Sequence, residues 1–316
     1  MAATNRTAII LAFAAVYLIW GSTYLGILFA IQSIPPFLMA GVRYSTAGLI
    51  MYGLTRAQGA ARPGRATWKP AAIIGACLLL GGNGGVTISE KYIDSGLAAV
   101  VIATVPIYIT LLGWLTGTAP RPKPIVWMGL IGGFIGVALL LGHTAQATGG
   151  RRPGLGIGIL LCSSFIWSAG SLYSRTVKGA PSPFLAAGQQ MICGGALLII
   201  AGFITGEHRG FDPRHITWLS LGAFIYLVVI GALVGFTAYI WLLRHCDPAK
   251  VATYAYVNPV VAMILGTFFA HETLSGRAVA GAILIIGSVA MVITAQQFMA
   301  RTGAPVAAFA EVEELR

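Results

Sequence analysis

Long apolar runs without charged residues, separated by short polar links, recur along the whole sequence. The hydrocarbon core of a bilayer is about 30 Å thick, and a helix of about 20 apolar residues spans it. The links are rich in proline and glycine, and they leave no room for a separate soluble domain. The pattern predicts ten transmembrane helices, at Thr7–Phe29, Phe37–Thr55, Pro70–Ser89, Ser95–Gly117, Pro124–Gly142, Gly154–Ser174, Phe184–Gly206, Ile216–Leu243, Val251–Ala270 and Ala278–Met299.

The second half of the chain repeats the first half. A block that begins at Asp94 recurs 153 positions later, and an earlier block of six residues recurs 147 positions later, namely Trp20, Pro36, Phe37, Leu38, Ala40 and Gly41. Because each copy has an odd number of spans, the two copies are inverted relative to each other, which is typical of transporters. We therefore expect an all-α membrane protein of ten helices in two inverted five-helix repeats, at residues 1–146 and 147–300, with a disordered cytoplasmic tail at 301–316.

Composition agrees with a membrane protein, because 57% of the residues are hydrophobic, 9% are charged and the mean hydropathy is +0.83. The net charge of +11 does not indicate nucleic acid as a partner, since all the basic residues except Arg43 fall in the links between spans or in the termini. With the N-terminus in the cytoplasm, 13 basic residues lie on the cytoplasmic side and 7 on the other. Cytoplasmic links gather lysine and arginine, so both termini are predicted to be cytoplasmic, in the cell's inner (plasma) membrane.

The cysteines and the first span exclude several classes of protein. The four cysteines lie far apart, so neither a disulfide framework nor a metal site is indicated, and no cofactor is predicted. The first apolar segment is too long for a signal-peptide core and is interpreted as a retained span.

Polar residues are costly at membrane depth, so they are the first candidates for a transport pathway. In the third predicted span, Asn83, Thr87 and Glu90 share one helical face, which is expected to line a cavity. Four glycines flank Asn83 and favour local unwinding there. Two alternatives remain open: close helix packing through the glycines, and an interfacial Glu90 paired with Lys91.

Arg43 lies about 10 Å inside the second span, at a depth where an unpaired guanidinium is costly. Its equivalent in the second repeat is Gln190. Inverted repeats bring equivalent positions toward the pseudo-twofold axis, so both side chains are candidates for binding substrate. The alternative is that Arg43 extends to the lipid headgroups.

Aromatic and hydroxyl residues form another set of candidates. Trp20 and Tyr24 share a face of the first span, and Trp167 occupies the corresponding part of the sixth span beside Ser171. We interpret the duplicated tryptophan as part of a cavity wall, although lipid-facing packing explains many membrane tryptophans. In the ninth span, Tyr254 and Asn258 are four residues apart and share a face.

Two prolines occupy equivalent positions in the repeats, Pro106 in the fourth span and Pro259 in the ninth. A proline inside a helix removes a backbone hydrogen bond and bends the helix. Their symmetric placement makes both candidates for a hinge or gate, and a purely structural bend is the alternative.

Three groups of residues resemble the EamA-type branch of the drug/metabolite transporter superfamily, and the resemblance covers nearly the whole chain. They are Ile19-Trp20-Gly21-Ser22, the stretch from Ser95 to Pro106, and Tyr256-Val257-Asn258-Pro259 with the following His271-Glu272-Thr273-Leu274. The resemblance implies two five-helix repeats around a central cavity and the export of small metabolites. The acidic residue that many members carry after the ninth span is Glu272 here, and the equivalent region after the fourth span has none.

The sequence therefore predicts a secondary transporter that exports small polar metabolites, such as amino acids, as a monomer or homodimer, with proton coupling through Glu90 as a further hypothesis. Proton-coupled efflux of drugs or amphiphiles is the alternative. The chain has no HExxH zinc pair, no GxSxG nucleophile motif and no phosphate-binding P-loop, so an enzyme or an ATP-driven pump is not expected. A membrane subunit without transport activity is a third and weaker hypothesis.

Overall fold

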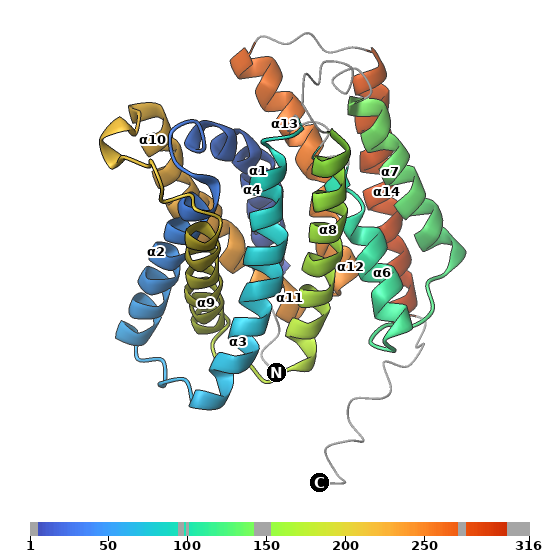
Figure 1. The fold of residues 1–316 in the computed structure, drawn as a ribbon. Coiled ribbons are helices and arrows are strands. Elements are labelled where there is room, and N and C mark those ends of the chain that lie inside the picture. Colours follow the sequence, from blue (N-terminus) through green and yellow to red (C-terminus); the bar gives the residue numbers. More distant parts are fainter. Residues whose placement is uncertain (1–5, 94–97, 99–100, 142–152, 271–275, 302–316) are drawn as a thin grey trace.

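The computed structural model describes residues 6–93, 98, 101–141, 153–270 and 276–301. Within these ranges the chain forms helices and turns and no strand (Figure 1). Every predicted span contains at least one helix in the described part, so the prediction of an all-α fold is confirmed. Three predicted features lie outside the described ranges: the boundary between the repeats at residues 146 and 147, the acidic residue Glu272, and the tail after Arg301.

The first five spans form the N-terminal repeat, and two of them are interrupted. The third span begins with a 3-10 helix at Arg65–Thr67 and has a π-helix between two α-helices, and the fourth is interrupted by a turn at residues 103 and 104. The helices are α1 (Arg6–Ala30), α2 (Pro36–Ala57), α3 (Trp68–Gly75), the π-helix η2 (Ala76–Gly84), α4 (Gly85–Ser89), α6 (Val105–Leu115) and α7 (Pro124–Leu141).

The second five spans follow the same plan. The eighth span again consists of two α-helices with a π-helix between them, and the ninth is again interrupted by a turn, at residues 252 and 253. The helices are α8 (Pro153–Thr176), α9 (Pro183–Ile204), α10 (Trp218–Tyr226), the π-helix η5 (Leu227–Phe236), α11 (Thr237–His245), α12 (Pro248–Val251), α13 (Tyr254–Ala270) and α14 (Gly276–Arg301).

Five helices are long and apolar enough to cross a bilayer as single elements in the described residues, counting α3, η2 and α4 as one and α10, η5 and α11 as another. The other three are α1, α8 and α9. Shorter apolar helices include Val105–Leu115, Pro124–Gly136 and Val279–Val292. The chain is therefore a multi-pass membrane protein.

The ends of α2 and α9 show that the repeats share their local structure. Both helices begin with a proline, Pro36 or Pro183, whose missing N–H is not needed in the first turn. Both are followed by a glycine with positive φ, Gly59 at 88° and Gly206 at 77°. Glycine adopts this conformation without strain and closes the C-terminal turn. Each pair is separated by 147 positions, the offset found in the sequence.

The contact between α2 and α9 shows that the repeats are inverted. A Cβ atom at Gly41 would lie 3.0 Å from the carbonyl oxygen of Gly195, and one at Gly48 would lie 3.0 Å from that of Gly188. The helices are therefore antiparallel. Because Gly41 is equivalent to Gly188 and Gly48 to Gly195, a pseudo-twofold axis exchanges these two contacts, as inverted repeats require.

The helices form a central group with a pair on either side (Figure 1). The pair α2 and α9 lies at one side of the molecule and the pair α7 and α14 at the other, so each outer pair contains one helix from each repeat. Between them lie α1, α8, α13 and the composite third span, and the eighth span runs from α10, near the ends of α2 and α9, to α11 in the centre. We call the side where α1 begins and α14 ends, lower in Figure 1, the terminal face, and the other side the opposite face.

The glycine-rich stretch around Asn83 is not unwound, which corrects the expectation from its composition. It forms the π-helix η2, whose hydrogen bonds reach one residue further than those of an α-helix. An unwound segment in lipid would leave backbone groups without partners, whereas a π-helix keeps them paired. The equivalent η5 contains only two glycines, Gly231 and Gly235, so glycine content alone does not determine this geometry.

Candidate functional site: a cavity between the repeats

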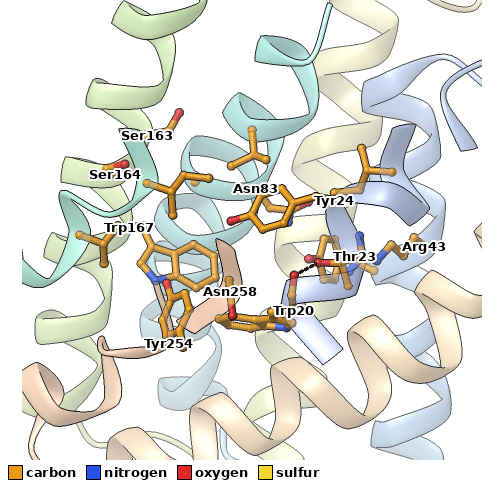
Figure 2. A pocket seen from close by; sticks show the side chains of 16 residues that line it. Trp20, Thr23, Tyr24, Arg43, Asn83, Ser163, Ser164, Trp167, Tyr254 and Asn258 are labelled. Carbon is orange, nitrogen blue, oxygen red and sulfur yellow. Dashed lines mark hydrogen bonds between the residues drawn. The ribbon is translucent and has the colours of Figure 1, made fainter. Parts of the chain in front are cut away.

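A cavity of about 70 Å³ lies between the two repeats (Figure 2). Its volume suits a few water molecules, so a metabolite requires the walls to move apart. Both repeats contribute polar or aromatic side chains to the wall. These are Trp20, Thr23 and Tyr24 of α1, Arg43 and Tyr44 of α2, Asn83 of η2, Ser163, Ser164 and Trp167 of α8, and Tyr254 and Asn258 of α13.

Arg43 is buried in this wall, with 1% of its surface exposed, so it does not extend to the lipid headgroups. Its Nε atom donates to the carbonyl oxygen of Leu227 at 3.1 Å, and its Cζ atom lies 4.6 Å from the ring centre of Tyr44. A Cβ atom at Gly231 would lie 2.8 Å from Nη2, so a side chain there would displace the guanidinium from its present position. Its Nη1 atom has no hydrogen-bond partner among the described residues.

Asn83 provides an acceptor to the same cavity, because its Oδ1 atom is buried and has no partner in the described part of the chain. Thr87 does not line the cavity; its hydroxyl donates to the carbonyl oxygen of Asn83 at 2.9 Å. Val86 follows Asn83 in the wall instead. The wide turn of η2 changes the register assumed for a regular α-helix, so only part of the predicted polar face reaches the cavity.

Glu90 follows α4 and lies beside the cavity rather than in its wall. Both carboxylate oxygens are shielded from solvent and have no hydrogen-bond partner among the described residues. The carboxylate is close enough to Tyr24, a wall residue, to interact with it electrostatically. The structure shows no ion pair between Glu90 and Lys91, the alternative that the sequence left open.

Four aromatic rings separate the cavity from the terminal face. Trp20 lies 5.5 Å from Trp167, 4.9 Å from Tyr239 and 4.8 Å from Tyr254, measured between ring centres. The Nε1 atom of Trp167 donates to the Tyr239 hydroxyl at 2.9 Å, and the Ser171 hydroxyl lies 2.7 Å from the same oxygen. We call Trp20, Trp167, Tyr239 and Tyr254 the aromatic cluster. Because its rings are in mutual contact, it closes the cavity on this side.

Asn258 connects the aromatic cluster to α1. In the amide orientation that satisfies its surroundings, its nitrogen donates to the carbonyl oxygens of Tyr254 at 3.0 Å and Tyr17 at 3.3 Å. The first helix of one repeat and the fourth span of the other are thus joined at the cavity.

The structure brings together seven of the ten substrate-binding candidates, which are Trp20, Tyr24, Arg43, Asn83, Trp167, Tyr254 and Asn258. Thr87, Ser171 and Gln190 do not line the cavity. Gln190 is buried on α9, and its side-chain oxygen has no partner among the described residues. Sequence reasoning missed Tyr239, although a tyrosine inside an otherwise apolar span was a detectable signal.

The two prolines differ in their positions within helices. Pro106 lies in the first turn of α6, directly after the turn at residues 103 and 104, so it begins a helix instead of bending a continuous one. Pro259 lies inside α13. A role for either proline as a hinge or gate stays a prediction.

The sequence matches the EamA-like transporter family twice, at residues 6–142 and at residues 154–294. The chain belongs to this family. Each match covers one of the repeats described above, and the predicted resemblance is confirmed. The protein is therefore a transporter of the EamA type.

This EamA transporter is similar to other proteins along most of their length. The "Uncharacterized inner membrane transporter YedA" of Escherichia coli K12 is 37% identical over 264 residues, which are 83% of this chain and 82% of that protein. The "Probable amino-acid metabolite efflux pump" of Salmonella typhimurium is 24% identical over 291 residues, which cover 86% of this chain and 90% of that protein. A solved crystal structure superposes with a TM-score of 0.74 at 20% identity, covering 92% of this chain and 98% of the other, and supports the fold.

Proposed function

We propose that this EamA transporter is an alternating-access carrier that exports small polar metabolites, amino acids or related compounds, from the cytoplasm. One observation carries the proposal: a cavity between inverted repeats holds a donor, Arg43 Nη1, and an acceptor, Asn83 Oδ1, that have no partner in the described part of the chain and lie among aromatic rings. An amino acid presents a carboxylate to the donor and an ammonium group to the acceptor. Arginine is well suited to this role because its planar fork matches a carboxylate.

The direction of transport rests on two supports. The excess of basic residues in alternate links favours a cytoplasmic location for both termini, and hence for the terminal face. One relative is named an inner membrane transporter, and another a probable amino-acid metabolite efflux pump. With the terminal face in the cytoplasm, the aromatic cluster lies between the cavity and the cytoplasm, which is the state of an alternating-access carrier closed on its cytoplasmic side.

The test is uptake or exchange by purified protein in proteoliposomes, screened with amino acids, organic acids and amines. Saturable flux of compounds that carry a carboxylate, competing with one another, is the expected result. Flux of hydrophobic amines alone would contradict the proposal and favour efflux of amphiphilic drugs. The absence of saturable flux for every compound would contradict transport of small metabolites.

We further propose that Glu90 couples transport to protons. An ionised carboxylate buried without a partner is costly, so this position favours a bound proton or a cationic group of the substrate. The Glu90→Gln change is therefore expected to abolish accumulation driven by a pH gradient and to retain downhill exchange. The measurement is flux in proteoliposomes with and without an imposed pH gradient.

Glu207→Gln is the matched control for this substitution. Glu207 lies outside the cavity and its Oε2 atom accepts a hydrogen bond from the Leu38 amide at 3.1 Å, which a glutamine oxygen also accepts. The control is expected to keep gradient-driven accumulation. Normal gradient-driven transport by the Glu90→Gln protein would rule out coupling through this carboxylate.

A further inference from the structure

A second cavity, of about 450 Å³, lies at the terminal face and is larger than the cavity between the repeats. It lies between the end of α6, the link that follows it, the end of α8 and the start of α12, which are close together in Figure 1. We call it the terminal cavity. Its polar lining residues are Thr110, Thr118, Arg121, Arg175, Thr176 and Asp247.

Two guanidinium groups are held in place at this cavity. The Nη1 atom of Arg175 donates to the carbonyl oxygen of Cys246 at 2.8 Å, and the Cζ atom of Arg121 lies 5.7 Å from the ring centre of Trp114. Neither forms an ion pair with a carboxylate of the described residues. The Asp247 carboxylate in the same wall accepts a hydrogen bond from the Ala249 amide at 2.8 Å. The wall therefore presents two guanidinium groups and one carboxylate to a solute, an excess of one positive charge.

A buried polar atom also faces this cavity without a partner. Thr110 is 7% exposed, and its hydroxyl has no hydrogen-bond partner among the described residues. Buried hydroxyls normally have a partner, so this atom is available to a ligand. A hydroxyl and two guanidinium groups in the lining of one cavity form a donor set that suits a carboxylate or a phosphate.

The terminal cavity and the cavity between the repeats lie along the same pair of helices. On α6, Val105 lines the cavity between the repeats, and Ile109, one turn later, lines the terminal cavity. On α8, Ser164 lines the first and Arg175 the second, about 16 Å apart along the helix axis.

One face of α8 joins the two cavities with polar groups. Ser164, Ser168, Ser171 and Arg175 follow the spacing i, i+4, i+7 and i+11, which places them on one side of the helix. Ser168 and Ser171 are fully buried, and the hydroxyl of Ser168 lies 3.4 Å from the carbonyl oxygen of Val105 on α6. The seam between α6 and α8 is therefore closed around the buried Ser168 hydroxyl, whereas the Ser171 hydroxyl contacts Tyr239 of α11.

We propose that the terminal cavity is an anion-binding vestibule. It attracts the carboxylate of a small solute to Arg121 and Arg175, and the solute then passes along the seam between α6 and α8 when the carrier opens to the terminal face. The direction of passage rests on the proposed function, whereas the anion site does not.

The anion site is tested with one thiol, introduced by Thr118→Cys, in a protein whose four native cysteines are replaced and which is held in nanodiscs of neutral lipid. Labelling rates are compared for methanethiosulfonate reagents that carry a sulfonate or a trimethylammonium group, each normalised to its rate with a free thiol. The sulfonate reagent is expected to react about fivefold to tenfold faster, because the local potential concentrates anions. The combination of Arg121→Gln and Arg175→Gln is expected to abolish this preference.

The matched control is the combination of Lys123→Gln and Lys178→Gln. These lysines lie two and three residues beyond the two arginines and do not line the cavity. The control removes the same net charge and is expected to keep most of the preference for the sulfonate reagent. An equal loss in both double variants, or no preference in the parent protein, overturns the anion site.

The source of the anion is tested by protection of the same thiol. Sodium glutamate is expected to slow labelling in neutral nanodiscs, and to do so less in the double arginine variant. Protection that appears only in phosphatidylglycerol nanodiscs would identify a lipid headgroup site and overturn a vestibule for solutes. These measurements need no transport, so the anion site can be supported even if the screen for flux fails, and it can fail while flux is observed.

Discussion

The Arg43→Gln change is expected to raise the KM for a substrate with a carboxylate about 100-fold. Glutamine retains a polar side chain but removes the positive charge and the fork of donors that includes Nη1. A hydrogen bond between charged groups contributes up to about 3 kcal/mol, which corresponds to about a 100-fold change in affinity. The KM of the Arg43→Lys protein is expected to lie between those of the parent and the Arg43→Gln protein. Its single ammonium group takes the place of two donors, Nε, which contacts the Leu227 carbonyl, and the free Nη1. The measurement is concentration-dependent flux in proteoliposomes.

Two comparisons separate this effect from damage to the fold. Arg56→Gln, on the same helix, changes a residue that does not line the cavity and is expected to leave KM unchanged. An amine analogue of the substrate that lacks the carboxylate is expected to be transported equally by the parent and the Arg43→Gln protein. The unfolding temperature is not expected to fall, since removing a buried charge that lacks an ionic partner relieves a desolvation cost. An equal loss of flux for the acid and the amine would contradict a role in binding carboxylates.

The Gly48→Ala change is expected to lower the free energy of unfolding by about 3 kcal/mol, the upper part of the range for overpacked cores. A Cβ atom at this position would lie 2.7 Å from the backbone nitrogen of Ile192 and 3.0 Å from the carbonyl oxygen of Gly188. Backbone atoms cannot move aside as a flexible side chain does, so α2 and α9 must separate. The loss is measured as the midpoint of thermal or denaturant unfolding of the purified protein.

Gly53→Ala is the matched control on the same helix, because a Cβ atom there meets nothing within 4 Å. It is expected to be neutral or slightly stabilising, since alanine favours helices over glycine. The pseudo-twofold axis adds a second requirement: Gly195→Ala, at the equivalent position, is expected to match Gly48→Ala. A large loss from Gly48→Ala with no loss from Gly195→Ala would contradict the symmetric crossing of α2 and α9.

The fold could be predicted because membrane spans leave a strong signal in sequence. Apolar length identified the spans, and the offset of 147 between Trp20 and Trp167 identified the repeat. The same offset relates Gly59 to Gly206, whose equivalent helix ends appear only in the structure. Local backbone geometry was less predictable, since glycine content suggested unwinding around Asn83 where hydrogen bonding in lipid favours a π-helix.

The site was predicted only in part. Equivalent positions in the two repeats need not have equivalent surroundings in a single conformation of a carrier. Arg43 lines the cavity and its equivalent Gln190 does not, although both are buried. A transporter that is closed on one side places its two repeats in different conformations, so equivalent residues have different neighbours.

Tyr239 was missed for a related reason. The offset between the repeats rises from 150 at Trp68 and Trp218 to 153 at Asp94 and Asp247, so the third and eighth spans do not align residue by residue. With an offset of 153, the equivalent of Tyr239 is Val86. The hydrogen bonds of Tyr239 to Trp167 and Ser171 therefore have no counterpart that the repeat could indicate.

The central claim is that the cavity between the inverted repeats holds the substrate. It is tested most directly by a thiol introduced through Ser163→Cys, at a wall residue with no assigned contact to substrate, in a protein without native cysteines that is labelled in proteoliposomes by a membrane-impermeant reagent. The account predicts labelling that slows in the presence of the substrate identified by the flux screen, while a thiol introduced at exposed Arg209 is labelled at the same rate with and without it. Equal labelling of the Ser163→Cys protein with and without saturating substrate would contradict the account.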